Sequence, residues 1–182
     1  MDGSPAGERR RYYHPEQKDY ATFLETSEET GGERTLIEVE VAPGGGTPPH
    51  YHKTYEEHFE VRRGELEVRV GGETRVLRPG EKASVPLDTR HNFRNPTGEN
   101  TVFLVELRPG SPGFEKALMA GYGLVSDGKN PFYHPYYLAV ILGWSDIRLP
   151  GVFTVAEPLL RLLERWARQK GVDKELEERY CR

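Results

Sequence analysis

The sequence predicts a mainly β protein, an antiparallel barrel or double-sheet sandwich followed by an α-helical C-terminal extension. From residue 19 to residue 107, apolar and polar residues alternate with period two in short segments separated by Gly or Pro. About eight such segments follow one another closely, which is typical of antiparallel barrels and double sheets. After Pro109 the apolar residues recur at helical spacing instead.

Length and local composition set the boundaries. The 182 residues fit one domain with a modest extension, and they are too few for two full barrels. The first 18 residues are charged and contain Pro, so we interpret 1–18 as an N-terminal tail. We assign the β-barrel to 19–110 and the α-helical extension to 111–182.

The strands can be predicted one by one. TLIEVEV places Ile37, Val39 and Val41 on one face, with glutamates on the other. GELEVRVGG turns at Gly71 and Gly72 into ETRVL, which predicts a hairpin with one solvated face. KASVP, HNFRN and TVFLVEL supply further short strands.

The extension contains three helical patterns. These are GFEKALMAGYG, the run from Tyr136 to Leu142, and a stretch that Pro158 is predicted to open. In the last one the apolar residues are Leu159, Leu160, Leu162, Leu163 and Trp166. This stripe is wider than a solvated helix shows, so something should cover it. It could pack on the outer face of its own barrel or also join two subunits.

Charge, hydropathy and cysteine content exclude several classes. The net charge of −4 provides no basic field for a phosphate backbone, so we expect no nucleic-acid partner. The longest apolar run, Phe132 to Trp144, is interrupted by His134 and Pro135 and is shorter than the roughly 20 residues that span a bilayer. The single cysteine, Cys181, cannot form an internal disulfide, so we expect a cytoplasmic protein.

Histidines gather in GGGTPPHYHKTYEEHFEVRRG. His50 and His52 are two residues apart, so on an extended segment their imidazoles share a face. In EEHFEV, Glu57 shares a face with Phe59 and Val61, which predicts that Glu57 points inward while Glu56 and His58 point outward. A turn must lie between His52 and Glu57, because their spacing of five breaks the alternation.

A second segment, GEKASVPLDTRHNFRN, adds His91, which is in step with Phe93 and Asn95 and therefore also faces the core. Three imidazoles and one carboxylate that converge inside an apolar barrel predict a first-row metal site formed by His50, His52, Glu57 and His91. We interpret Asn95 as structural, and His14 and His134 as ordinary surface or core residues. Glu56 and His58 are interpreted as a solvated strand face, with the alternative that either contacts a metal ligand.

These two segments resemble the two signature motifs of the cupin superfamily. The first motif reads here as Gly44, five residues, His50, one, His52, four, Glu57, six, and Gly64. The second reads as Gly80, five residues, Pro86, one, Asp88, two, His91, three, and Asn95. Only Asp88 departs from the pattern, where the family usually has Gly, and Asp tolerates turn conformations better than most residues.

The resemblance covers about residues 19–108 and implies a single cupin-like double-stranded β-helix, or jelly-roll, barrel. It implies that His50, His52, Glu57 and His91 bind one divalent first-row transition ion per chain. We favour iron or manganese, with zinc, nickel, cobalt or copper as alternatives. Cupin-like barrels often pair through an outer sheet face, so we expect a two-fold homodimer.

Two function classes remain open. The first is a metal-dependent enzyme of the oxygenase or isomerase type that acts on a small organic acid or phenol. The second is a non-catalytic module that binds a small molecule or a metal, and a metal that only braces the barrel belongs with it. No GxSxG motif presents a serine nucleophile, and no inward acid or base beside the metal stands out, so no catalytic side chain is predicted.

Overall fold

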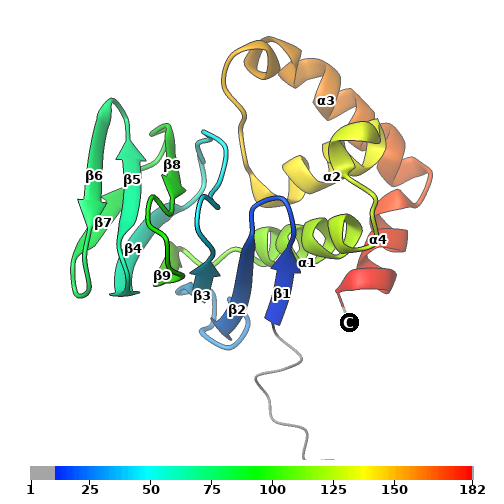
Figure 1. Ribbon diagram of the computed structural model, residues 1–182. Helices are drawn as coiled ribbons and strands as arrows, with labels where there is room; N and C mark the ends of the chain where they lie inside the picture. The colour runs from blue at the N-terminus through cyan, green and yellow to red at the C-terminus, as the bar shows by residue number, and fades with distance from the viewer. Residues whose placement is uncertain (1–10, 182) are drawn as a thin grey trace, which may run out of the picture.

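The computed structural model describes residues 11–181 and contains two antiparallel β-sheets followed by a group of helices (Figure 1). The six-stranded sheet has the order β1 (Arg11–His14), β2 (Asp19–Glu25), β3 (Thr35–Val41), β9 (Thr101–Arg108), β4 (Glu56–Arg63), β7 (Lys82–Val85). The three-stranded sheet has the order β6 (Glu73–Leu77), β5 (Leu66–Val70), β8 (His91–Arg94). The predicted sheet-rich barrel with a helical extension is confirmed.

The core follows from the alternation in the sequence. Ile37 on β3 lies opposite Val105 on β9, and Val105 lies opposite Phe59 on β4, so one apolar row crosses three strands. All three side chains are buried. Burying such a row removes apolar surface from water at roughly 25 cal/mol per Å². The predicted hairpin is also present, because β5 and β6 pair with Val70 opposite Glu73 around Gly71 and Gly72.

Two segments differ from the sequence-based prediction. The predicted tail 1–18 contains strand β1, which pairs with β2 so that His14 lies opposite Asp19. Tyr12 packs edge-on against Phe23 of β2, and this contact gives the strand an apolar anchor that its charged surroundings concealed. Residues 1–10 of that tail lie outside the described residues.

The second difference concerns the long helix of the extension. Helix α3 (Val152–Gln169) begins directly after Gly151, and Pro158 lies inside it. Pro158 therefore does not open the helix, although proline is most common at the first helical position. The rest of the extension comprises α1 (Pro112–Ser126), the 3-10 turn η2 (Pro131–Tyr133), α2 (Pro135–Ser145) and α4 (Val172–Tyr180).

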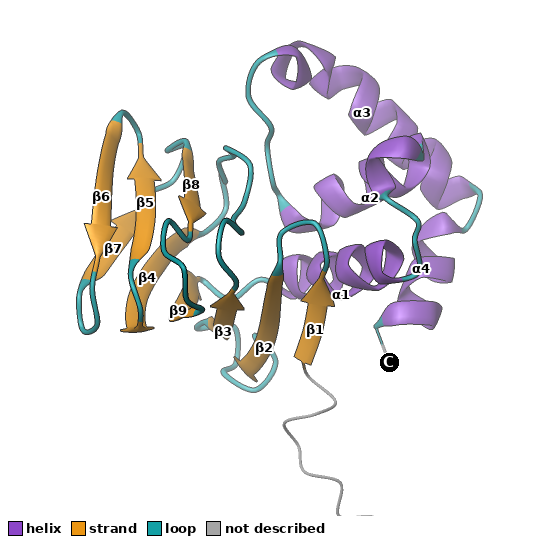
Figure 2. Cartoon of the chain, viewed as in Figure 1, coloured by secondary structure: helices purple, strands orange, loops and turns teal. Residues whose placement is uncertain are grey.

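Figure 2 shows the helices gathered on one side of the sheets, with α1 beside β1. Ser111 caps α1 by accepting a hydrogen bond from the Phe114 backbone N–H. The side chains of Phe114, Leu118 and Tyr122 pack against the barrel core. Helix α1 is therefore a wall of the barrel interior, and α2 and α4 pack against it.

Helix α3 packs against α2 and α4. Its apolar side chains Leu159 and Trp166 remain 57% and 46% exposed, so the alternative in which this stripe covers the outer face of the barrel is wrong. Among residues 11–181, no helix is both long enough and apolar enough to cross a membrane.

Candidate metal centre

The structure brings the four predicted ligands together inside the barrel. His50 and His52 come from the loop after β3, Glu57 lies near the start of β4, and His91 begins β8. One ligand atom from each residue can be chosen so that all lie within 4.8 Å of one another. All four side chains are buried, and His58 and Glu56 point away from the cluster, as the alternation predicted.

Backbone conformation places these side chains. His50 exchanges two backbone hydrogen bonds with His91, at 2.9 and 2.8 Å. The loop is therefore joined to β8 by an antiparallel β-bridge. Gly46 makes this approach feasible, because a Cβ there would lie 2.3 Å from the Phe93 carbonyl oxygen. Asp88 adopts φ 57°, the left-handed conformation for which the family usually uses Gly, and its N–H donates to the His52 carbonyl at 2.7 Å.

Each imidazole has one ring nitrogen fixed by an oxygen. His50 Nδ1 lies 2.8 Å from the Pro48 carbonyl, and His91 Nδ1 lies 2.9 Å from the Thr89 carbonyl. His52 Nδ1 lies 2.7 Å from the Tyr55 hydroxyl, whose proton is donated to the Ser145 carbonyl at 2.8 Å. Because these oxygens accept, each Nδ1 carries a proton, so that in its neutral form each imidazole has a lone pair on Nε2 for a ligand bond.

Glu57 gives the cluster its negative charge. Its Oε2 lies 2.7 Å from His91 Nε2 and 3.4 Å from His52 Nε2. Burial disfavours the charged carboxylate, but the nearby imidazoles, His91 at hydrogen-bond distance and His52 at 3.4 Å, outweigh it and lower the pKa of Glu57. Burial likewise acts against the charged form of His91, yet its hydrogen bond to Glu57 raises the pKa of His91. Burial, with help from the neighbouring histidines, lowers the pKa of His50 to about 3, so this imidazole is neutral at neutral pH.

The cluster fits a divalent ion. His52 Nε2 is buried and has no hydrogen-bond partner among the described residues. A lone pair without a donor inside a protein is costly, and so is an unprotonated nitrogen beside a carboxylate. A cation among three Nε2 atoms and one carboxylate would relieve both costs, and this donor set suits first-row transition metals.

Sequence reasoning missed the support that the extension gives to this site. Tyr51 and Arg148 exchange backbone hydrogen bonds at 3.1 and 2.9 Å. Asp146, which ends α2, accepts from the Lys53 N–H and the Thr54 hydroxyl at 2.8 and 2.9 Å. The loop that follows the histidines is thus bound to the end of α2. Tyr55, between His52 and Glu57, was the one local signal of such support in the sequence.

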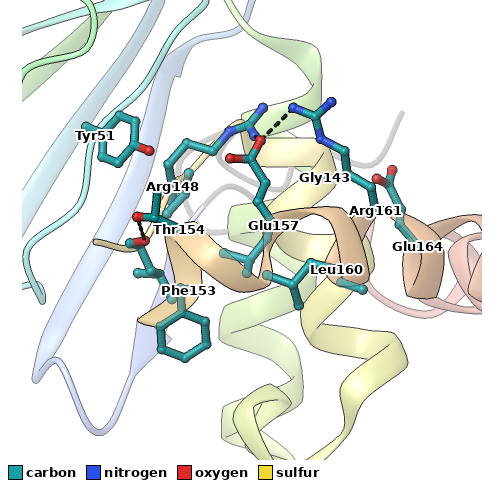
Figure 3. Close-up of a pocket in the computed structure, with 13 residues that line it drawn as sticks. Tyr51, Gly143, Arg148, Phe153, Thr154, Glu157, Leu160, Arg161 and Glu164 are labelled. Carbon is teal, nitrogen blue, oxygen red and sulfur yellow. Dashed lines mark hydrogen bonds and ion pairs between the residues drawn. The ribbon is translucent and has the colours of Figure 1, made fainter. Parts of the chain in front are cut away.

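A small cavity lies beside this junction (Figure 3). It has a volume of about 180 Å³, and Tyr51 and Arg148 line it together with residues of α3. Glu157 accepts from both Arg148 and Arg161, so the charged groups on this wall are paired with each other. This cavity therefore belongs to the packing of α3 on the loop.

A larger cavity, of about 200 Å³, begins at the candidate metal centre. His50 and Glu57 border it, and so do the apolar side chains of Phe93 and Val39. Helices α1 and α2 supply the opposite wall, which includes Leu118 and Ile141. The cluster is therefore not enclosed on every side by packed protein, because two of its four residues face a chamber.

Comparisons with known proteins agree with this geometry. The Cupin domain family matches residues 37–106. Polyketide synthase CurC of Streptomyces cyaneus is 40% identical over 70 residues, which are 38% of this chain and 46% of that protein. Quercetin 2,3-dioxygenase of Bacillus subtilis is 32% identical over 89 residues, which are 49% of this chain and 26% of that protein. The matched segments thus span less than half of these relatives.

Among solved structures, an RmlC-like cupin from Shewanella frigidimarina aligns with a TM-score of 0.52 at 19% identity. The alignment covers 63% of this chain and 96% of that one. At this identity the likeness concerns the fold alone, and it extends beyond the 70 residues matched by the family.

Proposed function

Because residues 37–106 match the Cupin domain family, we propose that the protein is a metal-dependent enzyme of the oxygenase or isomerase type acting on a small organic acid or phenol. One observation carries this proposal: His50 and Glu57 border a chamber of about 200 Å³. A metal that only braced the barrel would need no such chamber, whereas catalytic sites keep an open position. The similarity to a protein named quercetin 2,3-dioxygenase supports oxygen chemistry.

The size and lining of the chamber support a small organic ligand. An apolar cavity of roughly 150 Å³ admits a benzene molecule, so about 200 Å³ accommodates one ring with a few substituent atoms. Phe93, Val39 and Leu118 supply apolar walls, while the four clustered residues supply the polar end. This pattern of apolar walls with a few placed polar groups is typical of small-molecule sites.

The chain's own residues would do the positioning. The three Nε2 atoms and Glu57 would hold the ion, and Pro48, Thr89 and Tyr55 keep the imidazoles in the required tautomer. A bound divalent ion would supply Lewis-acid polarisation or activation of dioxygen. Phe93 and the side chains of α1 that border the chamber make its wall apolar, which would limit water beside the cluster and strengthen electrostatic interactions there.

Metal analysis combined with a substrate screen tests this function. We expect about one divalent ion per chain in protein purified without added metal, and loss of that ion in His52→Ala and His91→Ala. His58→Ala is the matched control, because His58 lies on the same strand as Glu57 but points outward to Ser84. Full occupancy in a variant lacking both His52 and His91 would contradict the assignment.

The screen should use small acids and phenols with and without oxygen. Chelation should remove turnover and added metal should restore it, while Cys181→Ser should leave it unchanged. The alternative function is a non-catalytic binding module, which the same chamber would serve. Metal-dependent ligand binding without turnover across an oxygen-supplied panel would favour that module, and turnover after complete metal removal would contradict both.

A further inference from the structure

The chamber has a second polar group of residues besides the metal centre. His14 and Asp19, which face each other across the β1–β2 hairpin, border the chamber together with Tyr122 of α1. The Tyr122 hydroxyl donates to Asp19 Oδ2 at 3.1 Å, and its ring packs edge-on against His14 at 4.9 Å between centroids. These three residues, here called the distal cluster, come from strands and a helix outside the 37–106 match.

Asp19 in this cluster is incompletely satisfied. Its side chain is only 1% exposed, yet Oδ1 has no hydrogen-bond partner within the described part of the chain. Most buried polar atoms in proteins have a partner, so an exception calls for an explanation. The buried carboxylate of Glu115 is a contrast, because its Oε1 accepts hydrogen bonds from the Ser27 N–H and the Thr35 hydroxyl, each at 2.6 Å.

The groups around Asp19 bring no positive charge to it. Burial raises the pKa of Asp19 to about 7, against the effect of the Tyr122 hydrogen bond. Burial also lowers the pKa of His14 and raises that of Tyr122 well above 10, so both neighbours are neutral near pH 7. Above about pH 7, where Asp19 is ionised, its Oδ1 is thus a strong acceptor without a donor among the described residues, and Asp19 borders the chamber.

The metal centre and the distal cluster lie at different places along the sheets. Asn95 donates to the carbonyl of Val41, the residue paired with Asp19, at 2.9 Å. His91 of the metal centre lies four residues earlier than Asn95, and a strand advances about 3.3 Å per residue. The two polar ends are thus displaced from each other along the chain, and both border one chamber of about 200 Å³, which accommodates one substituted ring.

We propose that Asp19 and Tyr122 form a recognition subsite for a hydrogen-bond donor, a hydroxyl or amino group, at the far end of the chamber ligand. The ligand is then a one-ring acid or phenol with oxygens directed to the metal centre at one end and a donor at the other. The metal-directed half of this description rests on the proposed function. The donor subsite does not, because Asp19 and Tyr122 need no ion to bind a donor.

Two probes of similar shape test the subsite. 4-Amino-2-hydroxybenzoate carries a donor at the distal position, and 2-hydroxy-4-methylbenzoate carries a methyl group of similar size there. We expect calorimetric titration of the metal-loaded protein at pH 8.5 to give about tenfold or greater preference for the amino probe, the effect of one hydrogen bond to a charged group. The titrations are repeated on metal-free protein.

Two variants remove the acceptor. Asp19→Leu retains the approximate volume of the side chain, and Asp19→Ala leaves space. If one of the two variants folds poorly, the other can still be titrated. Both should reduce the preference to about twofold or less. Glu38→Leu is the matched control, because Glu38 lies on the neighbouring strand β3 but alternates with the buried core residues, and it should keep the wild-type preference.

The outcomes separate the subsite from the proposed function. An amino preference that is the same in wild type and in both Asp19 variants overturns the subsite. No binding of either probe to wild type at millimolar concentration overturns the ligand class. In a third outcome, the amino preference depends on Asp19, but neither this preference nor the affinity for the probes differs between metal-loaded and metal-free protein. That outcome supports the subsite and counts against the metal-dependent function.

Discussion

Replacing Asp19 with asparagine should stabilise the protein, and the gain should grow as the pH rises. The pKa of Asp19 is about 7 in the folded chain, against 3.8 for an aspartate in water, because burial disfavours the charge. The folded state therefore binds the proton more tightly than the unfolded state, and stability falls as the pH rises between these values. The full difference corresponds to about 4 kcal/mol, of which about 2 kcal/mol falls between pH 5.5 and 8.5.

Urea unfolding of metal-loaded wild type and Asp19→Asn at a series of pH values measures this difference. The free energy of unfolding of the variant relative to wild type should increase by about 2 kcal/mol from pH 5.5 to pH 8.5, with the denaturant slope unchanged. Asp127→Asn is the control: hydrogen bonds from Tyr180 and Arg179 lower the pKa of Asp127, so it stays ionised throughout this window. A pH-independent difference for Asp19→Asn would refute the assignment of a buried, proton-retaining carboxyl.

Three further results are expected. Tyr55→Phe should weaken metal affinity about tenfold in a competition titration, because His52 Nδ1 loses its oxygen partner. Tyr133 is exposed, so Tyr133→Phe should leave metal affinity unchanged. Equal metal affinities of Tyr55→Phe and wild type would contradict the role of Tyr55. Glu115→Ala should lower the free energy of unfolding by about 3 kcal/mol, because the Ser27 N–H and the Thr35 hydroxyl lose their acceptor. A melting temperature within about 2 °C of wild type would contradict this role of Glu115. We also propose a homodimer that covers Leu159 and Trp166, so light scattering should give twice 20.7 kDa, and a monomer at micromolar concentration would count against it.

Local alternation was sufficient to predict which side chains of the cluster converge. Period two on β4 placed Glu57 with Phe59 inside and His58 outside, and the same rule placed His91 with Phe93. These assignments depend only on neighbours in the chain. The positive φ of Asp88 was similarly readable, because the motif usually has Gly at that position.

The rest of the site depends on contacts between residues far apart in the sequence. Tyr122 reaches Asp19 across 103 residues, and Tyr55 reaches the Ser145 carbonyl across 90. Asp19 lies where a charged segment meets the first barrel strand, so its neighbours in the chain do not mark it as an acid inside the chamber. Burial beside Tyr122, which no local pattern reveals, distinguishes it from a surface aspartate.

The division of the chamber wall between barrel and extension has an evolutionary consequence. The candidate ligands for the ion lie within residues 37–106, whereas Asp19, Tyr122 and the walls from α1 and α2 lie outside that stretch. Mutation of the flanking segments can therefore alter the chamber wall while the four candidate metal ligands remain unchanged. A lineage could acquire new specificities by drift and selection in its flanking helices. A library randomised only at α1 and α2 would reproduce that history in the laboratory.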